Sequence, residues 1–232
     1  MTQITCKNCG TLNDFYQLNC VQCGSLIRAR VVNIDLWRII WLVIDSPKKA
    51  FQNIIHAEHK NFIVLLGALI SVKLYFDAQF SCNLIFRDSP DITNLLIYLA
   101  ASIILFFVLI IIVSLLIKHL NSYLKIQTRF KDNLAVYIYS FIPLIVGLIL
   151  LLPVEYALFG NHWLVFNPSP FVIKQGPAWI LVSLEIVLHI WSVFLTIIAT
   201  YASTGRAVYS IPAGILIQAF VLGLYVAFTG IL

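Results

Sequence analysis

Five long apolar segments dominate the chain and constrain its fold more than any other feature. Each is long enough to cross a hydrocarbon core about 30 Å thick as a helix, which takes roughly 20 residues. Hydrophobic residues make up 61% of the sequence and charged residues 11%, against roughly 45–50% and about 25% in soluble domains. The sequence therefore predicts an all-α polytopic membrane protein, a five-span helical bundle with spans at 62–80, 92–117, 134–152, 179–201 and 211–232.

Two cysteine pairs lie in the polar segment ahead of the first span. Cys6 and Cys9 form one C-x-x-C pair, and Cys20 and Cys23 form the other. Two such turns facing each other close a tetrahedral site, and the glycine after each pair suits a turn that needs a positive φ. Four thiolates leave no open position, which predicts one structural zinc; a redox dithiol pair is the alternative. So short a segment buries no core of its own, so residues 1–27 are predicted to fold around the metal as a small cytosolic zinc ribbon.

The distribution of Lys and Arg predicts the orientation in the membrane, because cytoplasmic loops carry an excess of positive charge. Twelve lie on one side of the predicted bundle: Lys7, Arg28, Arg30, Arg38, Lys48, Lys49 and Lys60 before the first span, Lys118, Lys125, Arg129 and Lys131 in the second loop, and Arg206 in the fourth. Only Arg87 and Lys174 lie on the other side. We therefore expect a cytosolic N-terminus, where thiolates stay reduced, and an outside C-terminus. No secretory signal is evident in the first 33 residues.

Residues 28–60 predict a linker followed by interfacial amphipathic helices. Trp37 and Trp41 lie four apart, on one helical face, as interfacial anchors do. Ser46 and Pro47 then restart a helix as N-cap and first helical residue. The apolar stripe of this second helix consists of Ala50, Phe51, Ile54 and Ile55. Two helices on the cytoplasmic membrane face are expected; one short helix packed under the bundle is the alternative.

Four ionisable residues fall inside predicted spans. Lys73 and Asp77 share one face of the first span, and Glu185 and His189 share one face of the fourth. The two helices run in opposite directions, and at ~1.5 Å per residue Lys73 and Glu185 lie at nearly the same depth. Intramembrane charges cost about 2.5–3.5 kcal/mol each, so a Lys73–Glu185 pair is expected. The cluster either holds the two helices together or lines a polar cavity for a lipid headgroup, an ion or a proton.

Several further features have simpler interpretations. The segment 56–59 carries His56, Glu58 and His59 without H-E-x-x-H spacing, which predicts solvated interfacial residues. Pro143 is expected to kink the third span, with Ser140 as a partner for the freed backbone. The aromatic outer loop at 153–177 is expected to dip into the outer interface or to form a docking surface. The fifth cysteine, Cys82, lies far from the pairs, and we expect it to remain a thiol.

Two stretches resemble the Yip domain family, the Ypt/Rab-interacting type of membrane protein. Residues 46–55, reading Ser-Pro-Lys-Lys-Ala-Phe-Gln-Asn-Ile-Ile, are similar to the family's amphipathic Pro-x-x-Ala-Phe-x-x-Ile entry segment. Residues 133–143 are similar to its Ala-x-x-Tyr-x-x-x-Pro stretch. The glycine-rich run that often precedes the third span is absent at 125–131. The resemblance covers roughly 36–232 and implies a non-enzymatic integral membrane protein, tied in eukaryotes to vesicle traffic and small GTPases. With its ribbon, the chain resembles prokaryotic members, which implies a cytoplasmic membrane.

Three domains are therefore predicted: a zinc ribbon at 1–27, a linker with interfacial helices at 28–60, and a five-span Yip-like domain at 61–232. The favoured function is a membrane adaptor whose ribbon docks a cytosolic or membrane partner, within a membrane complex or a homo-oligomer. The alternative is a transport component for a lipid, ion or proton that uses Lys73, Asp77, Glu185 and His189. We find no nucleophile elbow, phosphate loop or triad order in the sequence, so we do not expect an enzyme. No nucleic-acid partner is expected.

Overall fold

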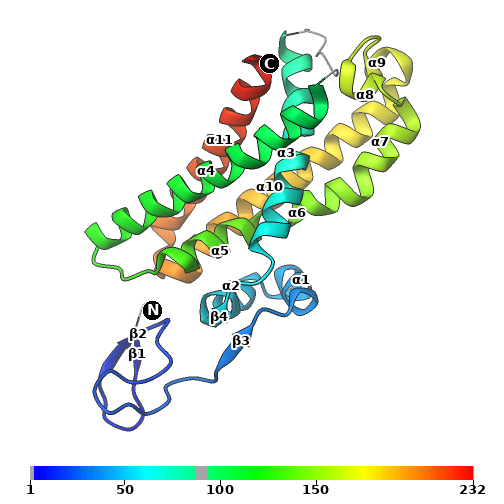
Figure 1. Ribbon diagram of the computed structural model, residues 1–232. Helices are drawn as coiled ribbons and strands as arrows, with labels where there is room; N and C mark the ends of the chain where they lie inside the picture. Colours follow the sequence, from blue (N-terminus) through cyan, green and yellow to red (C-terminus); the bar gives the residue numbers. More distant parts are fainter. Residues whose placement is uncertain (1–2, 87–93, 232) are drawn as a thin grey trace. The chain divides into compact units, whose positions relative to one another are not determined.

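A computed structural model describes residues 3–86 and 94–231 of the chain (Figure 1). The chain forms two compact units, each assembled from stretches that are far apart in sequence. Unit 1 comprises Met1–Ile63, Ile110–Ser140 and Leu195–Ile215, and unit 2 comprises Val64–Leu109, Phe141–Phe194 and Leu216–Leu232. Long helices run from one unit into the other, so a unit boundary is not a break in the helix. The three sequence domains remain a prediction based on composition.

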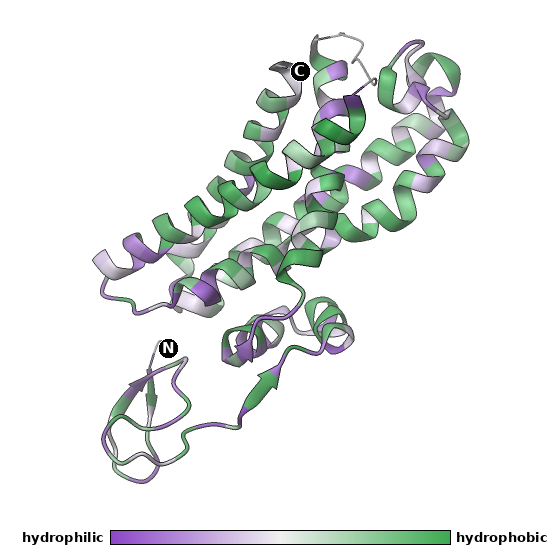
Figure 2. Cartoon of the chain, in the orientation of Figure 1, coloured by the Kyte–Doolittle hydropathy of each residue, from purple (hydrophilic) through white to green (hydrophobic). Residues whose placement is uncertain are grey.

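Five helical segments in the described part of the chain are long and apolar enough to cross a membrane, and Figure 2 shows these helices to be mostly hydrophobic. This confirms the predicted all-α polytopic class. The segments are Ile63–Ile85, Leu95–Tyr123, Ile142–Phe159, Gln175–Thr204 and Ala207–Gly230. They lie in helices α3 (Ile63–Phe86), α4 (Leu95–Tyr123), α6 (Ile142–Val146) to α7 (Leu152–Phe159), α10 (Gln175–Thr204) and α11 (Ala207–Ile231). Arg87 and the predicted start of the second span at 92 lie outside the described residues.

The third span differs most from its predicted range of 134–152. The helical path is interrupted at Phe141, two residues before Pro143, which lacks the N–H that a continuous helix would need. The helix therefore breaks where a kink was predicted. The Ser140 hydroxyl donates to the carbonyl of Tyr137, not to that of Tyr139, the carbonyl that Pro143 leaves without a helical donor. The apolar helical run then lies beyond the break. Its pieces are α5 (Phe130–Ser140) before the break, then α6 (Ile142–Val146), a π-helical turn η2 (Gly147–Leu151) and α7 (Leu152–Phe159).

Unit 1 is built around α5, which is buried on nearly all sides. Helix α2 (Pro47–His56) packs against α5 and against α1 (Leu36–Asp45). The apolar stripe of α2 is fully buried, so it faces protein rather than the membrane surface. This corrects the expectation for α2, whereas α1 leaves Trp37 and Trp41 exposed. The Ser46 side chain makes no cap bond to α2 and instead donates to Asp45.

The remaining part of unit 1 holds four short strands. Strands β1 (Gln3–Thr5) and β2 (Leu12–Asp14) pair antiparallel. Strands β3 (Val31–Asn33) and β4 (Ala57–His59) pair in parallel, although the sequence predicted a linker and solvated residues there. Beside this pair, Arg30 and Glu58 form a two-point ion pair at 2.8 and 3.0 Å. Three residues per strand carry too little hydrophobic alternation to predict a strand from sequence.

Unit 2 satisfies its polar side chains inside the apolar helices. The Ser102 hydroxyl of α4 donates to the carbonyl of Ser71, and Tyr225 of α11 donates to the carbonyl of Ser102, at 2.9 and 2.8 Å. Gln218 donates to the Ser192 hydroxyl at 2.9 Å. Such bonds matter in lipid because no water is available to take their place.

The predicted outer loop at 153–177 is largely helical. It contains the rest of α7, then α8 (His162–Val165) and α9 (Pro170–Ile173). Trp163 is buried, with its ring 4.6 Å from that of Phe80 and 5.2 Å from that of Phe159. This aromatic residue packs onto the protein itself, which differs from a loop dipping into the membrane interface.

A close approach between α10 and α11 within unit 1 yields a test of the fold. A Cβ on Gly214 would lie 2.8 and 2.9 Å from the backbone N and Cα of Ile197, which do not move without shifting the helix. We expect Gly214→Ala to lower the free energy of unfolding in detergent by about 1–3 kcal/mol, which is read as a lower melting temperature. Gly223→Ala, in the same helix with open space around it, is the matched control and should not destabilise. Equal melting temperatures for the two variants would contradict this packing.

Candidate metal centre and intramembrane polar cavity

The two cysteine pairs lie in turns of the same geometry. The backbone N–H of Gly10 donates to the carbonyl of Cys6, and that of Gly24 donates to Cys20, both at 3.0 Å. Gly10 and Gly24 have φ of 75° and 69°, the left-handed region in which glycine carries no steric penalty. The positive φ predicted for both glycines is therefore present. Each turn therefore presents its two thiols from the same backbone geometry.

The four thiols converge on one point. All four Sγ atoms lie within 4.8 Å of one another, and the shortest cross-turn distances are 3.7 Å for Cys6–Cys23 and 3.5 Å for Cys9–Cys20. A tetrahedron with Zn–S bonds of about 2.3 Å places its sulfurs about 3.7 Å apart. The residues present therefore fit a closed four-sulfur metal site. No disulfide joins the cysteines of the described chain, and Cys82 lies buried in α3.

Hydroxyl groups surround the thiols and favour their ionised form. The Ser25 hydroxyl lies 3.0 Å from Cys23 Sγ and 3.3 Å from Cys6 Sγ. Hydrogen bonds from the Ser25 side chain and backbone lower the pKa of Cys23 to about 5. Asn13 donates to Cys20 Sγ at 3.6 Å. Because metal ligation requires thiolates, these donors prepare the site for a divalent cation.

The ribbon is held within unit 1 by two aromatic contacts. The Phe15 ring lies 4.5 Å from the His56 ring of α2, and the Arg129 guanidinium lies 4.8 Å from the Tyr16 ring centroid. Burial, and then the charge of Arg28, lower the pKa of His56 to about 4. His56 is therefore a neutral, half-buried side chain at neutral pH, which corrects the expectation that it is solvated. Glu58 and His59 are exposed as expected.

Asp132 of α5 joins these contacts to the rest of unit 1. Its carboxylate pairs with Lys60 at 2.9 Å and takes a two-point contact from Arg129 at 2.7 and 3.2 Å. Lys60 also donates to the carbonyls of Ile54 and Ile55, where α2 ends. The side chains of Lys60 and Asp132 are only 7% and 5% exposed. Asp132 thus pairs with both Lys60 and Arg129, which the sequence had indicated only as markers of membrane orientation.

The four predicted intramembrane residues meet in unit 2. Lys73 lies 2.5 Å from Glu185 Oε1 and 2.7 Å from Asp77 Oδ1. His189 Nε2 lies 3.1 Å from Asp77 Oδ2. The structure therefore brings Lys73 and Glu185 together, as their depths in the two helices predicted, and Lys73 is 1% exposed. Gly147 of η2 makes room for this ammonium, because a Cβ there would lie 2.8 Å from Lys73 Cε.

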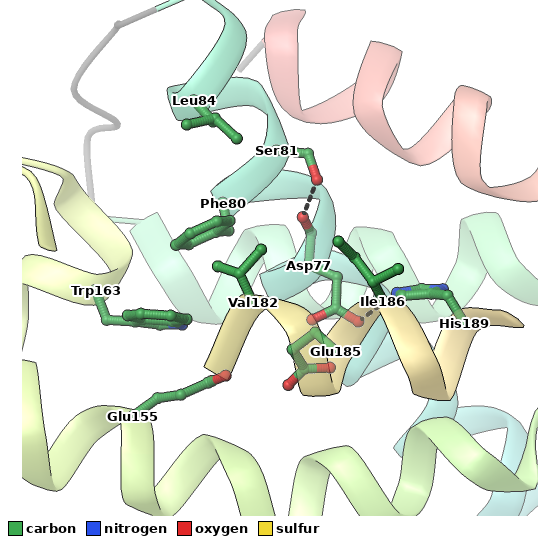
Figure 3. Close-up of a pocket in the computed structure, with 10 residues that line it drawn as sticks. All are labelled: Asp77, Phe80, Ser81, Leu84, Glu155, Trp163, Val182, Glu185, Ile186 and His189. Atoms are coloured by element: carbon green, nitrogen blue, oxygen red, sulfur yellow. Dashed lines mark hydrogen bonds and ion pairs between the residues drawn. The ribbon is translucent and has the colours of Figure 1, made fainter. Parts of the chain in front are cut away.

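A cavity of about 190 Å³ opens beside this cluster (Figure 3). Asp77, Glu185 and His189 line one part of it, and the aromatic rings of Phe80 and Trp163 line another. Glu155 of α7 also lines it and is 1% exposed. Glu155 lies beyond the predicted end of the third span at 152, so it was not among the predicted intramembrane residues. The arrangement supplies several acceptors for a positively charged or proton-donating group.

Comparison with known proteins supplies the family. The model of the Yip1 domain matches residues 41–231. The chain belongs to the Yip1 domain family. No curated protein and no solved structure matches it. The Yip1 domain match begins within α1, so the four-cysteine ribbon lies outside it.

Two residues of this Yip1 domain that matter to the sites were missed in the sequence. Asp132 follows the four basic residues of the second loop, and that charge pattern alone would have suggested a local partner. Glu155 follows Pro153, which was predicted to end the span. In the structure Pro153 is the second residue of α7 and comes directly after the π-helical turn, so the helical path continues through it. The apolar residues that follow Pro153 were therefore the available signal.

The neutral state of His56 makes ribbon packing pH-dependent. The pKa is about 4 in the folded state and about 6.5 unfolded, so only the unfolded state gains a proton between these values. Stability is then lost as pH falls from about 6.5 towards 4, by about 1 kcal/mol at pH 5.5. We expect resistance of the ribbon to limited proteolysis to fall between pH 7.5 and 5.5 in zinc-saturated protein. His56→Phe should remove most of this difference; an unchanged pH dependence would contradict the assignment.

Removal of the Lys73 ammonium should destabilise unit 2, because it leaves the carboxylates of Asp77 and Glu185 without their cation. We expect Lys73→Met to cost about 3 kcal/mol, read as a lower melting temperature and lower yield in detergent. Lys49→Met makes the same charge change at an exposed position of α2 and should have no comparable effect. Similar losses for both variants would show that net charge, rather than the buried pair, sets stability.

Proposed function

We propose that this Yip1 domain protein is a non-enzymatic membrane adaptor. Its ribbon would dock a cytosolic or membrane partner, and its helical bundle would organise a membrane complex. The proposal includes a structural zinc on Cys6, Cys9, Cys20 and Cys23, a cytosolic N-terminus and a lipid bilayer around the spans. The match to the Yip1 domain and the five apolar helices support membrane integration.

The observation that carries the proposal is the exposed apolar surface of the ribbon. Leu12, Val21 and Leu26 are 59%, 67% and 71% exposed. A module this small needs its metal to fold, so side chains that it leaves exposed contribute nothing to its own core. The buried centre of a protein–protein contact is more apolar than the rest of the protein surface and is depleted in charged residues. The three aliphatic residues are therefore suited to partner binding.

The test separates the exposed residues from the metal. We would purify full-length protein under mild conditions and measure zinc per chain together with co-purifying proteins by mass spectrometry. Substitution of Leu12, Val21 and Leu26 by Ser should keep one zinc per chain and lose a specific partner at least tenfold. Cys9→Ser should lose both the zinc and the partner.

Matched controls decide the outcome. Lys7→Ser changes an exposed polar residue of the ribbon and should keep the partner, whereas Cys82→Ser should keep the zinc. The adaptor proposal is abandoned if the triple Ser variant retains every partner of the wild type. A zinc content near zero in the wild type would overturn the metal assignment instead.

A second candidate function, a transport component for a lipid, ion or proton, is favoured by the cavity beside Lys73, Asp77, Glu185 and His189. Intramembrane ionisable groups that face a cavity are typical of transport pathways. Neutral variants of these residues that fold would lose activity in a transport protein and would retain partner binding in an adaptor.

A further inference from the structure

We propose that the cavity of unit 2 binds a primary ammonium group, either on a phospholipid headgroup or on a free amine. The site consists of the Glu155 and Glu185 carboxylates, with the apolar wall formed by Phe80, Trp163 and Val182 (Figure 3). Binding at this site requires neither a partner of the ribbon nor transport, so its test is independent of both functions proposed above.

Carboxyl groups outnumber basic groups around the cavity. Asp77, Glu155 and Glu185 supply three carboxyl groups, and Lys73 and His189 supply two basic groups. Both Asp77 oxygens have partners, since Oδ1 lies beside Lys73 and Oδ2 beside His189. Glu185 uses Oε1 for Lys73, and its Oε2 is buried without a hydrogen-bond partner. Acceptor capacity for another cation therefore remains on the glutamates.

Glu155 points most clearly to a ligand. The residue is only 1% exposed, its Oε1 has no hydrogen-bond donor, and its carboxyl group lies within hydrogen-bonding reach of another carboxyl group, that of Glu185. In Figure 3 its carboxyl group extends from α7 towards the cavity beside Glu185. A buried carboxylate oxygen without a donor is costly in an apolar surrounding. A bound group that donates hydrogen bonds and carries positive charge would remove this cost.

The shape of the cavity selects an amphiphilic cation. Its volume of about 190 Å³ is well above the roughly 10–15 Å³ that one water needs on the same measure, so it has room for an aminoalkyl group. Apolar side chains, which include Leu84 and Ile186, line it together with the acidic ones. A ligand with an ammonium end and an apolar part therefore matches both kinds of side chain.

The depth of Glu155 suits a headgroup. It lies four residues before Phe159, where α7 ends, so at ~1.5 Å per residue it is about 6 Å from the helix end. A hydrocarbon core about 30 Å thick in a bilayer of about 40–45 Å leaves a headgroup region roughly 5–8 Å thick on each side. Trp163, in the following helix, is a residue type enriched at that level.

A divalent metal fits less well. Within the described residues, only the four cysteines converge closely enough to hold a metal ion. A primary ammonium offers three N–H donors to these carboxylates, whereas a quaternary ammonium offers none. The site should therefore distinguish ethanolamine from choline headgroups.

The experiment compares these headgroups directly. Full-length delipidated protein in detergent is mixed with equal amounts of phosphatidylethanolamine and phosphatidylcholine of identical acyl chains, and bound lipid is counted by native mass spectrometry. We expect at least a tenfold preference for the ethanolamine lipid, lost in Glu155→Gln. Glu58→Gln makes the same change at an exposed residue of β4 and should keep the preference.

Free ethanolamine distinguishes the two sources of the amine. If millimolar ethanolamine binds in a Glu155-dependent manner while the lipids show no preference, the ligand is a free amine and the ammonium site stands. Equal binding of both lipids with no ethanolamine binding overturns the proposal and leaves a proton shared between Glu155 and Glu185. This wild-type comparison decides the question even if Glu155→Gln fails to fold.

Discussion

Unit 2 depends on one buried ammonium group. Lys73 is almost completely removed from solvent and contacts Asp77 on its own helix and Glu185 on α10. In a membrane helix no water compensates a lone charge, so the two carboxylates and the ammonium stabilise one another's ionised states. The same contacts fix the rotation of α3 and α10, and Gly147 leaves the space that the lysine stem occupies.

Unit 1 applies the same principle with the signs reversed. There one carboxylate, Asp132, holds Lys60 and Arg129, and these cations contact the end of α2 and the ring of Tyr16. The ribbon thus contacts this charge network through the ring of Tyr16 and contacts α2 through the ring of Phe15. Such a contact responds to salt and pH more readily than apolar packing does.

The sequence predicted the features that rest on spacing. Cysteine spacing located the four-sulfur site, and helical periodicity with equal depth paired Lys73 with Glu185. It did not predict features that depend on tertiary context. The stripe of α2 is equally apolar whether it faces lipid or α5, and only packing decides between them. Glu155 was missed because the sequence does not show whether a helix ends at Pro153 or continues through it.

The π-helical turn at Gly147–Leu151 has a consequence for how such a domain varies by insertion and deletion. A turn of this kind contains one residue more than an α-helical path needs, and each α-helical residue advances about 100° around the axis. A chain shortened by one residue within this turn would close it into an α-helical path and keep the direction of the residues that follow. The same deletion between Leu152 and Glu155 has no extra residue to absorb it, so Glu155 would take the exposed direction of Val154, about 100° away. The acidic side of the cavity therefore tolerates a one-residue length change inside the turn and not one after it.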